Sequence, residues 1–194
     1  MEERSEVMHQ YEKINGLYQL LSGNRKNSRM DIETYVQRHY LEQILEAANQ
    51  RFQDMSAGQF ELRMCDIDKA GTGKNRGLDL MVYSAVTGKV REVRTLSGGE
   101  SFMAALSLAL GMADQIQESS AAINLDMMFI DEGFGTLDEE SLLRALHVLQ
   151  ELAGGQRLVG VISHVAALKD CIERKIEVRA APAGGSTVHV VCGD

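Results

Sequence analysis

The chain of 194 residues has one proline, Pro182, no tryptophan and only three cysteines. A chain almost free of proline can form long helices, because proline interrupts the helical hydrogen-bond ladder. The cysteines, Cys65, Cys171 and Cys192, are odd in number and show no C-x-x-C spacing, which argues against a disulfide framework and against a zinc site. The reducing cytoplasm is therefore the expected compartment.

Long hydrophobic runs are also missing. No stretch approaches about eighteen apolar residues, so no membrane span is predicted, and the charged start MEERSEV has no secretory signal. Hydrophobic residues still make up 44% of the chain, enough for a sizeable core. The net charge is −8, and residues 96–194 hold 14 acidic against 6 basic side chains. This half is poorly suited to wrap a phosphate backbone, which requires clustered Lys and Arg.

Two helices are predicted in the first third of the chain. In residues 2–22 the apolar residues alternate at steps of four and three, the a/d spacing of a coiled coil: Val7, Tyr11, Ile14, Tyr18 and Leu21. The seam lasts only about two heptads, so an amphipathic helix packed on a core is an equal alternative. After a polar break at 22–29, a second helix is expected to start at the N-cap Asp31 and to stop at Gly58.

An antiparallel meander is expected next. Alternating apolar and polar residues predict strands at 60–65 and 78–83, followed by a short strand near 90–94. The polar connection contains GTGKN at 71–75, which invites interpretation as a phosphate-binding P-loop. It lacks the Gly required five residues before Gly-Lys and the Ser or Thr after it, so we interpret it as a hairpin loop. The sequence contains no other Walker A candidate.

From residue 96 the pattern is that of an α/β fold. Three helices are predicted, at about 98–117, 138–153 and 165–172. The first is expected to bury one face: Phe102, Leu106, Ala109, Ala113 and Ile116. The runs LDMMFI (125–130) and LVGVI (158–162) are almost wholly apolar, as expected for strands covered on both faces. Strands at 174–180 and 186–192, joined by a Gly-rich turn, predict a terminal hairpin.

Polar side chains follow both apolar strands. Asp131 and Glu132 come directly after the first strand, and His164 follows the second. Because α/β folds bind ligands at the carboxyl ends of their strands, we expect these three side chains to open onto one edge. One carboxylate can hold Mg²⁺, directly or through water, and the next can orient and activate a water. A surface Asp-Glu pair with a helix-capping histidine is the competing interpretation.

The segment LSGGE at 96–100 begins the first of the three later helices. Ser97 and Glu100 have the spacing of a capping box. Gly98 and Gly99 leave the first-turn N–H groups uncovered, and an uncovered helix N-terminus binds anions. Since glycine costs about 1 kcal/mol inside a helix, the pair indicates a need for bare backbone, with phosphate as the expected ligand. An ordinary capped helix is the alternative.

Four motifs stand in the order found in ABC-type ATPases. They resemble the signature motif (LSGGE, 96–100), the Walker B strand (MMFIDE, 127–132), the D-loop (GTLD, 135–138) and the switch histidine (SH, 163–164). Four motifs in register are highly specific. Within this superfamily the chain most resembles the SbcC-type, SMC-like ATPases, relatives of the Rad-type DNA-repair ATPases. This resemblance is carried by residues 35–52, 95–102, 129–142 and 159–169.

The resemblance implies an α/β fold, the C-terminal half of an ABC-type ATPase head preceded by a coiled-coil root helix. Residues 1–29 would form the root and a break, and residues 30–194 the C-terminal lobe with its parallel strands, flanking helices and antiparallel strands. The N-terminal lobe with Walker A and the coiled-coil apex with its zinc hook are missing from the sequence. ATP hydrolysis is therefore expected only after joining to that lobe, and the chain alone is expected to be inactive.

The resemblance also implies how the site residues divide between two nucleotides. In the family the two lobes of one head hold one ATP, and the signature motif of a second head covers its γ-phosphate. Glu132 would then be the catalytic base, His164 the switch histidine, and Asp131 the aspartate that holds Mg²⁺ through water. Four residues would act in trans on a partner's nucleotide: Ser97, Gly98, Gly99 and Glu100. Asp138 would lie at the interface between the heads.

The implied partners are the N-terminal lobe, a second identical head, an SbcD-like nuclease subunit and, through the complex, DNA. The complex would process DNA double-strand breaks as an exonuclease, and no membrane partner is expected. Two alternatives stay open. The chain would be a fragment of another SMC-like or transport ATPase, or a non-catalytic module that uses the seam of residues 2–22 to bind a partner.

Overall fold

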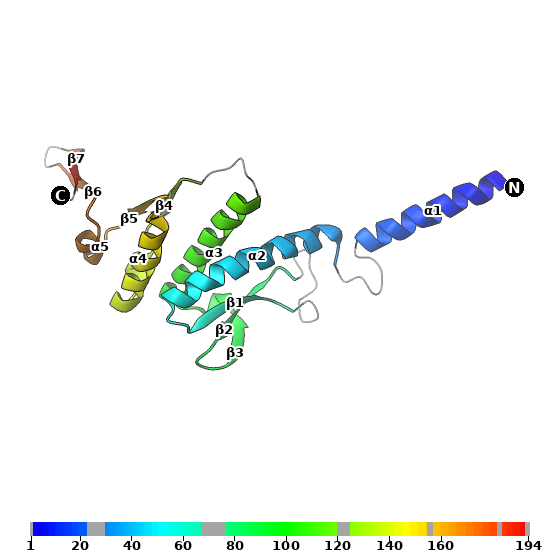
Figure 1. The fold of residues 1–194 in the computed structure, drawn as a ribbon, viewed down its shortest axis with the longest axis horizontal. Helices are drawn as coiled ribbons and strands as arrows, with labels where there is room; N and C mark the ends of the chain where they lie inside the picture. The colour runs from blue at the N-terminus through cyan, green and yellow to red at the C-terminus, as the bar shows by residue number, and fades with distance from the viewer. Residues whose placement is uncertain are drawn as a thin grey trace.

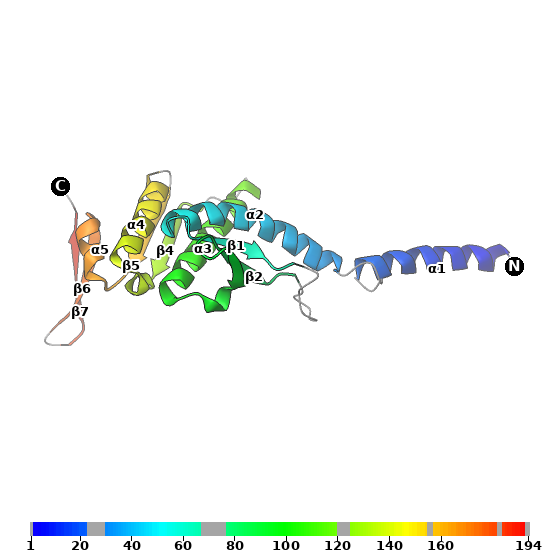
Figure 2. The same ribbon diagram turned by 90° about the horizontal axis from the view of Figure 1, so that it is seen from below.

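The computed structural model describes residues 2–22, 30–66, 77–119, 125–154, 157–181 and 184–192. Helix α1 (Glu2–Leu21) projects from one end of the molecule, and the C-terminal hairpin lies at the other (Figures 1 and 2). The predicted first helix is thus confirmed. Its seam is open to solvent, with exposed fractions of 64% for Val7, 69% for Ile14 and 65% for Tyr18. The alternative of an amphipathic helix packed on a core is wrong among the described residues.

Helix α2 (Ile32–Met55) begins and ends where predicted. The Asp31 carboxylate accepts the backbone N–H of Thr34 at 2.7 Å, and this hydrogen bond holds the pKa of Asp31 below its ordinary value of 3.8. Gly58 takes a left-handed backbone conformation just after the helix (φ +72°). The C-terminal half lies in the core, where Phe52 is fully buried. Four apolar residues of the N-terminal half are exposed: Ile32, Tyr35, Val36 and Tyr40.

Three strands form the predicted antiparallel meander, in the order β1 (Phe60–Met64), β2 (Leu80–Ser84) and β3 (Lys89–Glu92). Their inward side chains, among them Leu62 and Val82, complete the core formed with α2. A 3₁₀ turn, η1 (Val93–Thr95), then leads to the next helix. The GTGKN segment at 71–75 lies outside the described residues.

Helix α3 (Gly98–Ser119) lies directly against α2 (Figure 2). A Cβ at Gly111 would stand 2.6 Å from the carbonyl oxygen of Ile44 and 2.9 Å from the amide of Ala48. Glycine is therefore required where the two helix backbones approach each other.

The buried face of α3 differs in part from the prediction. Leu106 and Ala113 are buried as expected, whereas Ala109 and Ile116 are exposed. Met103 and Leu110 are buried in their place. The helix is covered by α2 on one side and by the η2 turn (Phe134–Thr136) near its start, so its covered stripe does not follow one helical row.

Two strands and a helix form the α/β part. Strands β4 (Met127–Asp131) and β5 (Leu158–Ile162) pair in parallel, with helix α4 (Glu139–Ala153) between them in sequence. One face of this sheet packs on the core through Met128, Ile130, Val159 and Val161. On the opposite face Met127, Phe129, Leu158 and Ile162 are 55%, 65%, 58% and 55% exposed.

The prediction that β4 and β5 are covered on both faces is therefore wrong for this chain. Both faces are apolar in sequence, yet no described element covers the second one. The side chains of Met127, Phe129, Leu158 and Ile162 thus form an apolar patch, here named the open sheet face. Patches of this kind mark an interaction surface.

The chain ends in helix α5 (Ala166–Cys171) and the predicted hairpin of β6 (Lys175–Ala180) and β7 (Ser186–Val191). One side of the hairpin is apolar and exposed, with Ile176, Val178, Val188 and Val190 each at least 60% exposed. No described helix is both long and apolar enough to cross a membrane.

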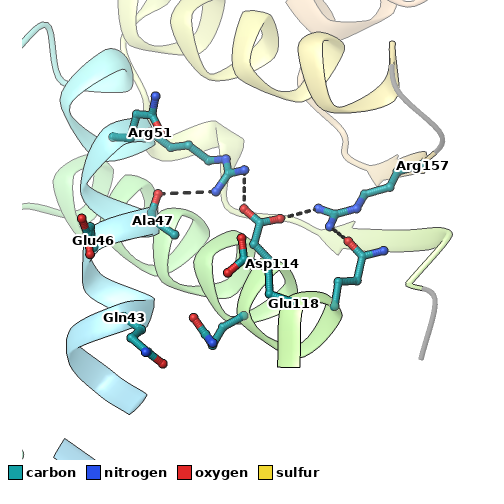
Figure 3. A pocket seen from close by; sticks show the side chains of 10 residues that line it. Gln43, Glu46, Ala47, Arg51, Asp114, Glu118 and Arg157 are labelled. Carbon is teal, nitrogen blue, oxygen red and sulfur yellow. Dashed lines mark hydrogen bonds and ion pairs between the residues drawn. The ribbon is translucent and has the colours of Figure 1, made fainter. Parts of the chain in front are cut away.

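A polar hollow of about 660 Å³ lies between α2, α3 and the start of β5 (Figure 3). Asp114 bridges the other two segments, with carboxylate oxygens 2.6 Å from the Arg51 guanidinium and 2.8 Å from that of Arg157. Because Arg157 precedes β5, the hollow lies at the amino end of that strand. The usual ligand edge of parallel sheets is the opposite, carboxyl end, so we interpret this ion network as a structural tie.

Candidate functional site

The carboxyl ends of β4 and β5 bring the predicted carboxylates and histidine together. Asp131 is the last residue of β4 and stands opposite Ile162 at the end of β5. The backbone N–H of Glu132 donates to the carbonyl of Ile162 at 2.9 Å, which continues the ladder by one residue. The Glu132 carboxylate lies 2.9 Å from Nδ1 of His164. The expected meeting of these side chains at one edge is therefore observed.

The chain turns sharply at this edge. Glu132 has φ +60° and Gly133 has φ +94°, so two successive residues take the left-handed conformation. Among the described non-glycine residues only Ala57 shares a positive φ. Such a conformation is strained for a residue with a Cβ and persists only where surrounding contacts hold it. Glu132 and His164 both stay accessible, with side chains 55% and 78% exposed, as groups that receive a ligand must be.

The loop after Glu132 is packed rather than free. Phe134 is 1% exposed, and the Thr136 hydroxyl donates to the carbonyl of Gly133 at 2.8 Å. Asp138 then caps α4 by accepting the Ser141 backbone N–H at 2.9 Å. This hydrogen bond is the main cause that lowers the pKa of Asp138 below 3.8. Asp138 thus has a role as a helix cap that the sequence analysis did not assign to it.

The predicted capping box at the start of α3 is present. The Glu100 carboxylate accepts the Ser97 backbone N–H at 2.7 Å, and the Ser97 hydroxyl accepts the Glu100 N–H at 3.3 Å. The same Glu100 oxygen lies 3.3 Å from the guanidinium of Arg91, which also donates to the Thr95 carbonyl at 2.8 Å. Arg91 on β3 therefore braces the segment that enters the signature motif.

The two signature glycines have different surroundings. A Cβ at Gly99 would stand 2.8 Å from the carbonyl oxygen of Thr136, so this glycine is required by packing against the η2 turn. A Cβ at Gly98 would meet only the Thr136 side chain at ordinary contact distances of 3.6 and 3.7 Å. Bare backbone for a ligand is thus needed to explain Gly98 but not Gly99.

Three residues at the site were missed by sequence reasoning. Arg91, Phe102 and Thr136 join the signature segment to its surroundings, and none was singled out for the site from the sequence. Only Phe102 had a sequence signal, its place on the predicted apolar face of α3. Here it is half-buried, with its ring edge-on to that of Phe134 at 4.9 Å between centroids.

The donor set fits a magnesium ion that is shared with a nucleotide. Among the described residues no group of three or more His, Cys, Asp or Glu side chains could enclose a metal. Mg²⁺ usually takes one or two carboxylates and completes its shell with waters and substrate phosphates. A single strand-end carboxylate, Asp131, beside Glu132 suits that arrangement better than a closed metal site.

Comparison with known proteins agrees with this geometry. The family described as "SbcC/RAD50-like, Walker B motif" matches residues 78–151, which hold the signature segment, β4 and most of α4. A solved chain studied for ATP-driven dimerization and DNA-stimulated activation of SMC ATPases aligns with a TM-score of 0.62. It is 18% identical, and the alignment covers 81% of this chain and 89% of that one. The SMC head domain of Pyrococcus furiosus aligns with a TM-score of 0.58 and 18% identity over 82% of this chain and 37% of that chain.

The fold is therefore that of an SMC-type ATPase head, and the predicted fold class is confirmed. Relatives narrow the family further. The SbcC subunit of the SbcCD nuclease from Treponema pallidum is 42% identical over 193 residues, all of this chain and 17% of the relative. The corresponding protein of Vibrio cholerae is 42% identical over 182 residues, 94% of this chain and 18% of the relative. The chain belongs to the SbcC family, and it spans about a sixth of the length of these relatives.

Proposed function

We propose that the chain is the C-terminal lobe of an SbcC-like ATPase head. Residues 30–194 form the lobe, and residues 1–29 form the root of a coiled coil whose second strand covers the exposed seam of α1. The open sheet face supports this proposal, because an apolar sheet surface requires a second layer. The expected layer is the N-terminal lobe of the same ATPase, which carries the Walker A motif.

The proposed chemistry is ATP hydrolysis, and the observation that carries it is the contact between Glu132 and His164 beyond β4 and β5. Glu132 orients the attacking water and accepts its proton, and His164 holds the Glu132 carboxylate and faces the γ-phosphate. Asp131 holds Mg²⁺ through water, and the ion supplies charge neutralisation for the phosphates. Phosphoryl transfer depends on positioning and electrostatics, which suits a site built from few side chains.

The signature segment serves a second nucleotide. We propose that Ser97, Gly98 and Gly99 bind the γ-phosphate of ATP held by a second, identical head, through the helix N-terminus of α3. Glu100 keeps Ser97 in place through the capping box. Asp138 lies at the interface between the heads, in addition to capping α4.

ATP-driven engagement of the heads then moves the coiled coils and an SbcD-like nuclease partner within a cytoplasmic complex. This step rests on the name shared by the relatives, which describes each as part of the SbcCD nuclease. DNA, with double-strand breaks as the expected target, is the substrate of the complex rather than of this lobe alone.

The first test is ATP hydrolysis by the chain alone and after co-expression with the Walker A lobe. We expect activity only in the mixture. Activity of the chain alone would contradict the division of the site between lobes. In the assembled head, Glu132→Gln should trap an ATP-bound dimer, detected by light scattering. Glu151→Gln is a matched control, because it removes another exposed Glu–His pair, with His147 on α4. Unchanged turnover in Glu132→Gln would refute the role of Glu132.

A further inference from the structure

The turn that carries Glu132 is held from the side by the signature helix. A Cβ at Gly133 would overlap the ring of Phe102, so the ring lies against the bare backbone of Gly133. The ring of Phe102 also packs edge-on against that of Phe134, with 4.9 Å between centroids. Phe102 thus touches both residues that follow Glu132.

A second contact joins the same two segments. The backbone of Gly99 packs on the Thr136 carbonyl, where a Cβ would stand only 2.8 Å away. Thr136 in turn donates its hydroxyl to the carbonyl of Gly133. The start of α3 and the turn after β4 therefore contact each other at two points, and a shift of one requires a shift of the other.

This contact unit links groups with different tasks. Phe102 lies in the second turn of the same helix whose N-terminus begins after Ser97, and Gly133 is covalently next to Glu132. Glu132 keeps its left-handed backbone (φ +60°) only because its neighbours hold it there. Packed side chains transmit a displacement because interiors are dense and deform little.

We propose that Phe102 is a positioning residue that couples the signature helix to Glu132 within one lobe. The inference rests on the proposed function, in which Ser97 grips the nucleotide of the partner head and Glu132 serves the nucleotide of its own head. Occupation of the signature segment then fixes the turn through Phe102 and prepares Glu132. Coupling of this kind is reciprocal, so each nucleotide favours binding of the other.

A head dimer with one competent site separates this signal from direct binding. One head carries an isotope-labelled copy of this chain and an N-terminal lobe whose Walker A lysine is changed, so it holds no nucleotide of its own. Its signature segment still faces the intact site of the unlabelled head. A non-hydrolysable ATP analogue with Mg²⁺ is added, and amide hydrogen exchange is measured in the labelled peptide 129–137.

We expect the analogue to slow exchange in this peptide at least about fivefold, the low end of common coupling strengths. Phe102→Ala should remove the slowing, while the analogue still brings the heads together. Leu106→Ala is the matched control, because it deletes a buried side chain one turn further along α3 and should keep the slowing. Where Phe102→Ala does not fold, Phe102→Leu keeps an apolar side chain but loses the flat ring against Gly133, and should weaken the slowing.

The outcomes separate the two proposals. Slowing that persists in the Phe102 variants overturns the positioning role of Phe102. The absence of slowing in the unchanged chain, with heads engaged, also overturns the coupling. Failure of the analogue to bind or to engage unchanged heads instead refutes the proposed ATPase function itself.

Discussion

The helical core and the parallel sheet are both built from apolar segments, but they end in opposite states. Phe52 on α2 is 0% exposed, whereas Phe129 on β4 is 65% exposed. The core is closed by its own chain, through α2, α3, α4 and the meander. The sheet has a layer on one face only. Apolar composition therefore reports what a segment covers in the assembled protein, and the open sheet face identifies where the assembly continues.

The sharpest way to test this contrast is to truncate one phenylalanine in each region. Phe52→Ala should destabilise the chain by about 3–5 kcal/mol, because it leaves a cavity in a closed core. Phe129→Ala should change stability by less than about 0.5 kcal/mol, as expected for an exposed site. Urea denaturation of the chain alone measures both free energies of unfolding.

The same pair gives a different result once the Walker A lobe is present. Phe129→Ala should then weaken association of the two lobes, measured by co-purification or calorimetry. A large loss of stability from Phe129→Ala in the chain alone would show that its ring is already covered and would contradict the open sheet face.

Local signals explain which parts of the fold could be predicted. The caps Asp31 and Asp138, the capping box and the hairpins depend on residues three or four apart or on adjacent strands. Their side-chain chemistry specifies them without knowledge of the tertiary structure. The coverage of β4 and β5 could not be predicted, because a doubly apolar strand looks the same whether its second layer comes from the same chain or from another.

The site divides in the same way. The approach of Glu132 to His164 could be predicted, because parallel strands place their carboxyl ends at one edge. The packing of Phe102 on Gly133 and of Gly99 on Thr136 could not. These contacts join segments more than thirty residues apart and leave no periodic trace in the sequence. Gly99 also shows why a glycine motif is ambiguous, since a close backbone neighbour and a ligand demand the same residue.

The paired glycines of the signature segment allow the next test. Gly99→Ala places a Cβ 2.8 Å from the Thr136 carbonyl, and we expect a loss of about 1–3 kcal/mol from overpacking. Gly98→Ala makes only ordinary contacts and should stabilise the chain by about 0.4–1 kcal/mol through reduced freedom of the unfolded state. Thermal unfolding of both variants measures these effects.

Binding should reverse the order of the glycine variants. In the assembled head, Gly98→Ala covers a first-turn N–H and should reduce ATP-driven dimerisation although the chain is stable. Normal dimerisation of Gly98→Ala would refute the role of its bare backbone in binding phosphate.

A smaller effect is expected where Arg91 braces the signature segment. Arg91→Leu removes the bonds to the Thr95 carbonyl and to Glu100 and should cost about 1 kcal/mol, the usual net value of a hydrogen bond. Arg94→Leu is the control, since Arg94 pairs with Glu92 while 81% exposed, and exposed pairs contribute little. Equal melting temperatures of the two variants would show that Arg91 does not brace the segment.

The smallest effect concerns pH and the cap of α4. Hydrogen bonds from Ser141 lower the pKa of Asp138 in the folded state below its ordinary value of 3.8. A carboxyl group with a depressed folded pKa adds stability that is fully present above its unfolded pKa and is lost as pH falls through the folded value. Asp138 should therefore contribute at neutral pH and lose its contribution below about pH 3.8. Asp138→Asn keeps a side-chain oxygen to accept the Ser141 N–H but cannot ionise. Its melting temperature should fall slightly less steeply than that of the unchanged chain as pH drops from 5 to 3, an interval chosen to bracket this value. Asp31→Asn, at the matching cap of α2, should flatten the curve in the same direction, and an unchanged slope in both variants would show that neither cap depends on its charge.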